Sequence, residues 1–155
     1  MMSDYQRSTR ECTLDSMNPA LETAVHQYIE THQLGSVLSH TQFCGETTST
    51  RQKKGLFGRK SESSHTGFWL APPWLIWATA KEGEATAVLA ARLRDIQVQD
   101  YERSEMVKLV PDSGINITGL RQGDEGVGTA FIGLGPEPAA QTFRERLRQA
   151  VDQAK

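Results

Sequence analysis

The most concentrated chemistry in this sequence is a short basic segment near its middle. Residues 51–60 read RQKKGLFGRK and hold five of the 17 lysines and arginines but no aspartate or glutamate. The rest of the chain has 12 basic and 19 acidic residues, a net charge of −7, so the positive charge is local. Each lysine or arginine held near an anionic membrane surface contributes about 1 kcal/mol to binding. The basic residues of the segment are Arg51, Lys53, Lys54, Arg59 and Lys60.

Two apolar residues, Leu56 and Phe57, lie inside this basic segment between Gly55 and Gly58. The glycines predict a hairpin tip that exposes both side chains. Inserting each side chain into a lipid surface would contribute roughly 1.5–3 kcal/mol. Together with the five charges, the gross gain is about 8–11 kcal/mol, before the cost of ordering the loop is subtracted. The segment therefore predicts weak, salt-sensitive binding to an anionic surface.

Other interpretations of residues 51–60 stay open. The charges could only keep a mobile, solvated hairpin from pairing edge to edge with another chain. The segment could also bind an acidic protein. Nucleic acid is disfavoured as a partner, because the basic cluster is small and the net charge of the whole chain is −2.

The histidines and cysteines do not have the spacing of a metal site. His40 and Cys44 would share a face of a strand, but their Cα atoms would lie about 13 Å apart, too far to chelate one ion. His65 could lie near His40 across a hairpin, which would supply at most part of a site. No His-Glu-x-x-His or Cys-x-x-Cys motif is present. We therefore expect no metal.

No other motif predicts catalysis. The glycines of residues 123–128 resemble a phosphate-binding loop only superficially, because no Lys-Ser/Thr pair follows them. Asp95, Asp100, Asp112 and Asp124 are spread over the expected strands and turns, and no pair of them has a spacing typical of acid–base catalysis. We expect a non-enzymatic protein that needs no cofactor.

Length and composition fit one globular domain. The chain has 155 residues, of which 37% are hydrophobic and 23% charged. No apolar run approaches the ~18 residues of a membrane span, and residues 1–4 do not begin a secretion signal. Cys12 and Cys44 are too few for a disulfide scaffold, so a reduced, cytoplasmic setting is expected, with peripheral attachment to a membrane as an addition.

The N-terminal part predicts a tail followed by a helix. Residues 1–17 are polar and predict a flexible tail. Asn18 is a suitable N-cap, Pro19 suits the first helical position, and Gly35 predicts the stop. Apolar residues then recur at three- and four-residue steps, which predicts a helix over 19–33 within a segment 18–35. Its apolar stripe must be covered, so self-association through this helix is one expectation.

Residues 36–134 predict short strands separated by turns. The alternating or β-branched segments are 37–44, 47–50, 63–70, 115–118 and 129–134, and residues 74–80 form a nearly continuous apolar run. Pro72-Pro73 and Glu82-Gly83 predict breaks in the strands. Residues 85–99 suit either a helix or two strands, because the segment is rich in alanine but its end alternates. We favour two strands, over 85–91 and about 95–101.

A C-terminal helix is predicted after Pro136 and Pro138. Ala140, Phe143, Leu147, Val151 and Ala154 recur at helical spacing and predict one buried stripe.

Two further surfaces could contact a partner. Arg144 and Arg148 lie one helical turn apart, which usually gives a solvated face but could dock an acidic partner. Trp69, Trp74 and Trp77 are expected in the core or at its rim. If Trp69 or Trp74 were exposed, it could form an aromatic contact surface.

The order of these elements resembles the pleckstrin-homology-like superfold, in its bacterial PH-domain and GRAM-related branches. The segments that carry the resemblance are 74–77, 92–96, 128–134 and the helix after Pro136, and it covers residues 36–155. It implies an α+β, mainly β fold. About seven antiparallel strands would form a barrel, a C-terminal helix would cap it, and the helix before residue 36 would be an addition.

The resemblance also implies a function. In this superfold, the loop between the first two strands carries the basic residues that hold phosphorylated lipid headgroups in lipid-binding members. Lys53, Lys54, Arg59 and Lys60 are the corresponding positions here. We therefore expect a binding module that engages an anionic membrane surface. The alternative is a protein–protein scaffolding module that uses a sheet edge or the face of the last helix.

Overall fold

The structure, a computed structural model, describes residues 5–55, 58–121 and 127–155, with only the backbone described at 52–55, 58–60, 121 and 127. The strands are β1 (Tyr5–Glu11), β2 (Phe43–Gly55), β3 (Gly58–Ala71), β4 (Trp74–Lys81), β5 (Ala87–Arg92), β6 (Gln97–Asp100), β7 (Gly114–Arg121) and β8 (Val127–Gly133). The α-helices are α1 (Pro19–Thr31) and α2 (Pro138–Ala154). Short 3₁₀ helices are η1 (Leu14–Ser16), η2 (Val37–His40), η3 (Leu93–Asp95), η4 (Tyr101–Arg103) and η5 (Glu105–Lys108).

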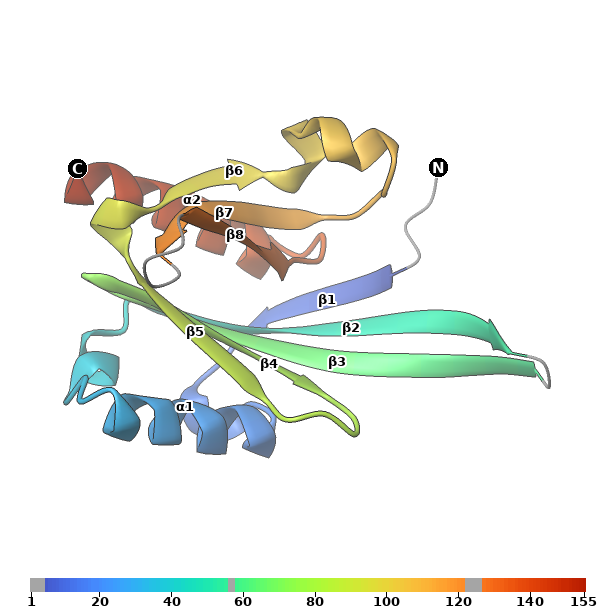
Figure 1. The fold of residues 1–155 in the computed structure, drawn as a ribbon, viewed down its shortest axis with the longest axis horizontal. Helices are drawn as coiled ribbons and strands as arrows, with labels where there is room; N and C mark the ends of the chain where they lie inside the picture. Colours follow the sequence, from blue (N-terminus) through green and yellow to red (C-terminus); the bar gives the residue numbers. More distant parts are fainter. Residues whose placement is uncertain (1–4, 56–57, 122–126) are drawn as a thin grey trace.

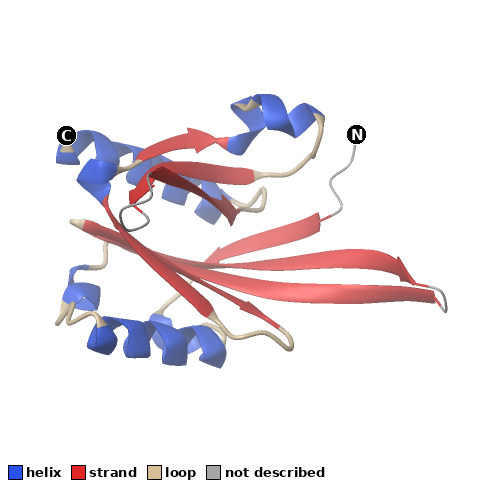
Figure 2. Ribbon diagram, in the orientation of Figure 1, coloured by secondary structure: helices blue, strands red, loops and turns tan. Residues whose placement is uncertain are grey.

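The fold is α+β and mainly β, as predicted, and it is built in layers. Strands β1 to β5 form one antiparallel sheet in sequence order, and β6, β7 and β8 form a second antiparallel sheet. Figure 1 shows α1 on one side of the five-stranded sheet and the three-stranded sheet with α2 on the other. Figure 2 shows the strands through the middle of the molecule and the helices at its outer sides.

The predicted closed barrel is wrong. Among the described residues, no ladder joins the two sheets. The chain leaves β5 at Arg92, turns through η3 and enters the other sheet at Gln97, so consecutive strands lie in different sheets. At the opposite edge, side chains make the connection. The backbone N–H of Thr9 donates to Glu137 at 2.6 Å, and the Thr9 hydroxyl accepts from the N–H of Gly135 at 2.8 Å.

Both faces of the five-stranded sheet are buried at β4, which explains the continuous apolar run in this strand. Leu75 and Trp77 point into the core shared with the three-stranded sheet and α2. Ile76 and Ala78, which alternate with them, face the second core beneath α1. A strand buried on both faces needs apolar residues at every position.

The C-terminal helix fills the space between the two sheets, as its sequence predicted. Phe143 and Leu147 are fully buried. The Phe143 ring stacks on Phe68 with centroids 4.2 Å apart and on Phe43 with centroids 5.8 Å apart. The predicted apolar stripe of α2 therefore faces the core.

The predicted N-terminal helix is confirmed, with Asn18 as its N-cap. The Asn18 side chain accepts from the N–H of Ala20 at 2.9 Å. The helix ends at Thr31, before the predicted residue 33, because Gln33 already takes the left-handed conformation, with φ 54°. Gly35, the predicted stop, is also left-handed, with φ 61°. Leu21 and Val25 pack on the five-stranded sheet, so this chain covers the apolar stripe and the argument for self-association loses its basis.

The prediction of a flexible tail over 1–17 is wrong from residue 5 onward. Residues 5–11 form β1, which pairs with β2 from Tyr5 opposite Arg51 to Glu11 opposite Gly45. The sequence did not indicate this strand because its inward residues are polar. Thr9 is buried and bonds the Thr47 hydroxyl at 2.8 Å.

The segment predicted to begin the first strand, 37–44, is largely a 3₁₀ turn. Side chains compete with strand pairing here. The Ser39 hydroxyl donates to the carbonyl of Ser36 at 2.6 Å, and the Thr41 hydroxyl donates to that of Leu38 at 2.6 Å. The strand β2 therefore begins only at Phe43.

The remaining predictions for the strands agree with the structure. Residues 85–99 contain two strands, β5 and β6, and no α-helix. The chain turns at Pro72-Pro73 and again at Glu82-Gly83, where Gly83 has a φ of 78°. Among the described residues, no helix combines the length and the apolar character needed to cross a bilayer.

Candidate functional site

The basic segment lies at the end of the longest hairpin. The β2–β3 ladder continues to Gly55 opposite Gly58, but β1 covers β2 only to Arg51 and β4 covers β3 only from Ser64. No described strand other than β2 and β3 themselves therefore lies beside residues 52–63. We call residues 52–63 the arm, and Figure 1 shows β2 and β3 extending beyond the rest of the sheet.

The register of the arm sets like charges opposite one another. Lys53 is paired with Lys60, and Lys54 with Arg59. Like charges directly opposite in an antiparallel pair destabilise it.

The predicted position of the basic segment at a hairpin is correct. The hairpin joins the second and third strands rather than the first and second, because β1 precedes it. Leu56 and Phe57 lie outside the described residues.

The base of the arm is held by an aromatic contact. Arg51 has its guanidinium carbon 5.5 Å from the centroid of the Tyr5 ring. Beside this contact is a hollow of about 180 Å³, and the residues that line it are Tyr5, Ser61, Glu62, Ser63, Ser64, Lys81, Glu82 and Glu84. Of the five predicted basic residues, Arg51 alone has a described side chain, and it is engaged within the protein.

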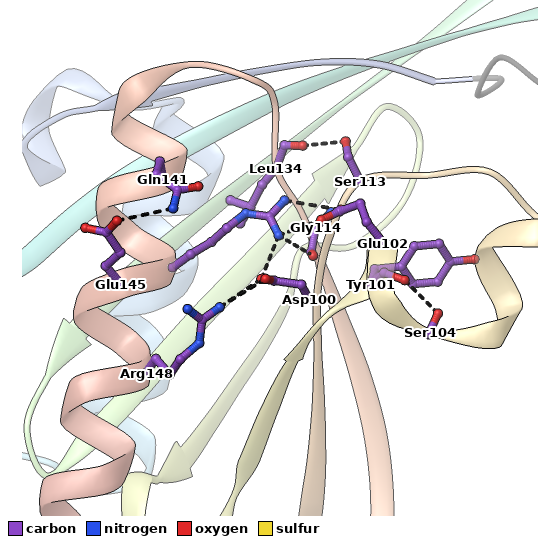
Figure 3. Close-up of polar contacts among 11 residues, drawn as sticks. Asp100, Tyr101, Glu102, Ser104, Ser113, Gly114, Leu134, Gln141, Glu145 and Arg148 are labelled. Carbon is purple, nitrogen blue, oxygen red and sulfur yellow. Dashed lines mark hydrogen bonds and ion pairs between the residues drawn. The ribbon is translucent and has the colours of Figure 1, made fainter.

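The arginines of α2 form an internal network with carboxylates of β6 and η4 (Figure 3). Arg144 donates to Asp100 and Glu102, each at 2.8 Å, and to the carbonyl of Gly114 at 3.0 Å. Burial alone would lower the pKa of Arg144, but its hydrogen bonds to Glu102 and Asp100 outweigh burial and raise it. Arg148 donates to both oxygens of Asp100 at 3.1 Å. The α2 arginines therefore connect the helix to the three-stranded sheet.

A second arginine connects the edges of the two sheets. Arg7 of β1 makes two hydrogen bonds of 2.7 Å to Asp112 and one of 2.6 Å to the Ser49 hydroxyl. Arg7 and Arg144 also line a polar hollow of about 490 Å³. Because both guanidinium groups are already paired with carboxylates, this hollow does not present unpaired positive charge.

An apolar cleft lies between the two sheets, where a closed barrel would have joined them. It has a volume of about 280 Å³ and lies between the end of β5 and the β7–β8 hairpin. Leu89, Ala91, Ile96, Leu120 and Ala130 line it, together with polar neighbours that include Asp95 and Thr129. Leu89 keeps 47% of its surface exposed. The sequence did not predict this cleft, because it results from the separation of the two sheets.

The tryptophans do not form an exposed aromatic surface. Trp69 and Trp77 are buried, at 1% and 4% exposure. Trp74 is half-buried and stacks with Arg92, whose guanidinium carbon is 5.0 Å from the ring centroid. The alternative of an aromatic contact surface at Trp69 is therefore wrong.

The histidines are separated rather than clustered. His40 lies in η2, whereas His65 lies in β3 opposite Thr48, so the two are not partners across a hairpin. In the described part of the chain, no group of three or more histidine, cysteine or acidic residues could hold a metal ion. The predicted glycine turn over 123–126 lies outside the described residues, and Gly128 belongs to β8.

One buried carboxylate escaped sequence analysis. Glu46 of β2 is 4% exposed and accepts hydrogen bonds from Arg10 of β1 at 2.8 Å and from the N–H of Asn18 at 2.9 Å. Its partners come from two segments far apart from it in sequence, so spacing could not indicate it.

Comparison of the chain with protein-family models, curated proteins and solved structures finds no match.

Proposed function

We propose that this protein is a non-enzymatic binding module of PH-like type that attaches to anionic membrane surfaces through the arm. The order of elements supports the PH-like assignment. Strands β2 to β5 correspond to the first four strands of that superfold, β6 to β8 to the next three, and α2 to the closing helix. In this correspondence β1 and α1 are additions, and the arm occupies the loop between the first two strands.

The observation that carries the proposal is that the arm projects beyond both neighbouring strands. The four β2 residues past Arg51 extend the arm by about 13 Å. The arm contains Lys53, Lys54, Arg59 and Lys60 and, through residue 61, no acidic residue. A two-stranded ribbon is only marginally stable without a third strand, and its two like-charge pairs weaken it further. Anionic headgroups would relieve that repulsion.

The expected affinity is modest. Four charges at about 1 kcal/mol each give roughly 4 kcal/mol, and insertion of Leu56 and Phe57 would add about 1.5–3 kcal/mol apiece. Ordering of the arm and loss of free motion reduce this sum. Exposed charges are screened by salt over about 10 Å at 0.1 M. Binding is therefore expected to be reversible and to fall as salt is added.

The test is co-sedimentation with vesicles. The full chain is mixed with vesicles of phosphatidylcholine alone or with phosphatidylserine, at low and high salt. We expect binding only to the anionic vesicles, and only at low salt. The reversal variant, with Lys53, Lys54, Arg59 and Lys60 changed to Glu, should not bind under any condition. Absence of wild-type binding to anionic vesicles at low salt would end the proposal.

The alternative function is a peptide-binding module that uses a sheet edge. The observation that favours it is the apolar cleft, because β5 is the last strand of its sheet and Leu89 beside the cleft is 47% exposed. An extended apolar peptide could pair with β5 and place a side chain in the cleft. Arg144 and Arg148 do not support a docking face on α2, since they are already paired. Peptide binding that is lost on Leu89→Glu, without vesicle binding, would favour this function.

A further inference from the structure

The fold brings together Cys12 and Cys44, the two cysteines of the sequence, just beyond the end of β1. The β1–β2 ladder ends with Glu11 opposite Gly45, and the next step sets Cys12 opposite Cys44. The N–H of Cys12 donates to the carbonyl of Cys44 at 3.1 Å, which continues the pairing. Cα atoms in such a hydrogen-bonded antiparallel pair lie about 5.5 Å apart. That separation is within the range that disulfides most often have.

The two thiols lie within interaction range of each other, and both side chains are half-buried against the core beneath α1. The interaction with Cys44, assisted by the nearby Arg10 charge, outweighs burial and lowers the pKa of Cys12. The same interaction and burial raise the pKa of Cys44. Cys12 is the less buried thiol and lies near the Arg10 charge, so it is the thiol that ionises more easily.

The geometry points to a reversible Cys12–Cys44 disulfide, a redox-modification site that joins the N-terminal segment covalently to the five-stranded sheet. A low-molecular-mass disulfide such as glutathione disulfide is the oxidant. The Cys12 thiolate attacks one of its sulfurs, which forms a mixed disulfide and releases one glutathione thiolate. Cys44 loses its proton and attacks the Cys12 sulfur, which releases the second glutathione. Two protein thiols become one disulfide, one glutathione disulfide becomes two thiols, and the two protons pass to glutathione.

The cross-link closes the chain between residues 12 and 44, a loop that contains α1. A disulfide across a loop of this length stabilises mainly by restricting the unfolded chain. For a domain of this size, we expect the melting temperature to rise by roughly 5–15 °C. This inference does not depend on the proposed membrane function, because the cysteine pair and the arm lie at different ends of β2.

The test uses the full chain in buffers with increasing ratios of oxidised to reduced glutathione. Free thiols are alkylated under denaturing conditions, and intact mass, gel mobility without reductant and melting temperature are measured. We expect a monomer that loses two hydrogen atoms, carries no alkylated thiol, melts at a higher temperature and reverts on addition of dithiothreitol.

Single substitutions supply matched controls. Neither Cys12→Ser nor Cys44→Ser should show the rise in melting temperature. Cys44→Ser should form a glutathione adduct at Cys12 faster than Cys12→Ser forms one at Cys44. The inference would be overturned if oxidised wild type held only glutathione adducts, covalent dimers or unreacted thiols, or if the internal disulfide lowered the melting temperature. The wild-type measurements decide the matter even if a variant fails to fold.

Discussion

The α2 helix and the arm carry the same kind of charge in opposite ways. On α2, the Arg144 side chain is 10% exposed and its guanidinium donates to Asp100, Glu102 and a backbone carbonyl. On the arm, the backbone register sets Lys54 opposite Arg59, two residues of like charge. The first arrangement connects two elements of one chain. The second is the arrangement on which the proposed binding of an external anion rests.

This difference shows that the residue type does not decide whether a positive charge is paired within the protein. What decides it is whether the fold brings a carboxylate to the charge. Asp100 ends β6 and Glu102 lies in η4, 44 and 42 residues before Arg144 in sequence, so helical spacing on α2 could not reveal them. The predictions below change one member of this comparison at a time.

Arg144→Met should have the largest effect on stability. It leaves Asp100 and Glu102 without their main partner and removes a hydrogen bond from Gly114. Breaking a buried pair costs about 3–5 kcal/mol, and partial solvent access at Glu102 reduces the expected loss to roughly 2–4 kcal/mol. Urea denaturation measures the loss. An unfolding free energy within about 0.5 kcal/mol of wild type would show that the network is not structural.

Arg148→Gln should have a much smaller effect, although it touches the same carboxylate. Its side chain is 48% exposed, and its 3.1 Å contacts to Asp100 lie at the solvent edge. Exposed ion pairs contribute about 0.2–1 kcal/mol. The same denaturation experiment should therefore rank Arg148→Gln well above Arg144→Met in stability. Equal losses would contradict the assignment of the main connection to Arg144.

Much of the fold could be predicted from periodicity and turn residues. The Phe143–Leu147 stripe, the run in β4 and the two strands within 85–99 follow from apolar spacing. Strand β1 could not be predicted, because its buried partners are Thr9 and Arg7, whose polar contacts come from distant segments. The prediction that the strands form a closed barrel was wrong, because strand order alone does not show that η3 carries the chain from one sheet to the other.

For the site, sequence analysis predicted a basic hairpin but not its relation to its neighbours. That no described strand flanks the arm depends on where β1 begins and β4 ends, at Tyr5 and Lys81. The Glu82-Gly83 turn indicates the end of β4, but no local signal in the sequence indicates β1. The Cys12–Cys44 pair was missed for the same reason as β1, since the strand that positions Cys12 was interpreted as part of a tail.

The most direct test of the account compares two variants that remove the same charge. One carries Lys54→Gln and Arg59→Gln on the arm. The other carries Arg146→Gln and Arg148→Gln on α2, where Arg146 is exposed and donates to the carbonyl of Gln42 at 3.1 Å. Affinity for phosphatidylserine-containing vesicles is measured by titration at low salt. At about 1 kcal/mol per charge, the arm variant should bind about 30-fold more weakly than wild type, whereas the α2 variant should stay within about twofold. Equal weakening would mean that net charge alone governs binding, and it would contradict the role given to the arm.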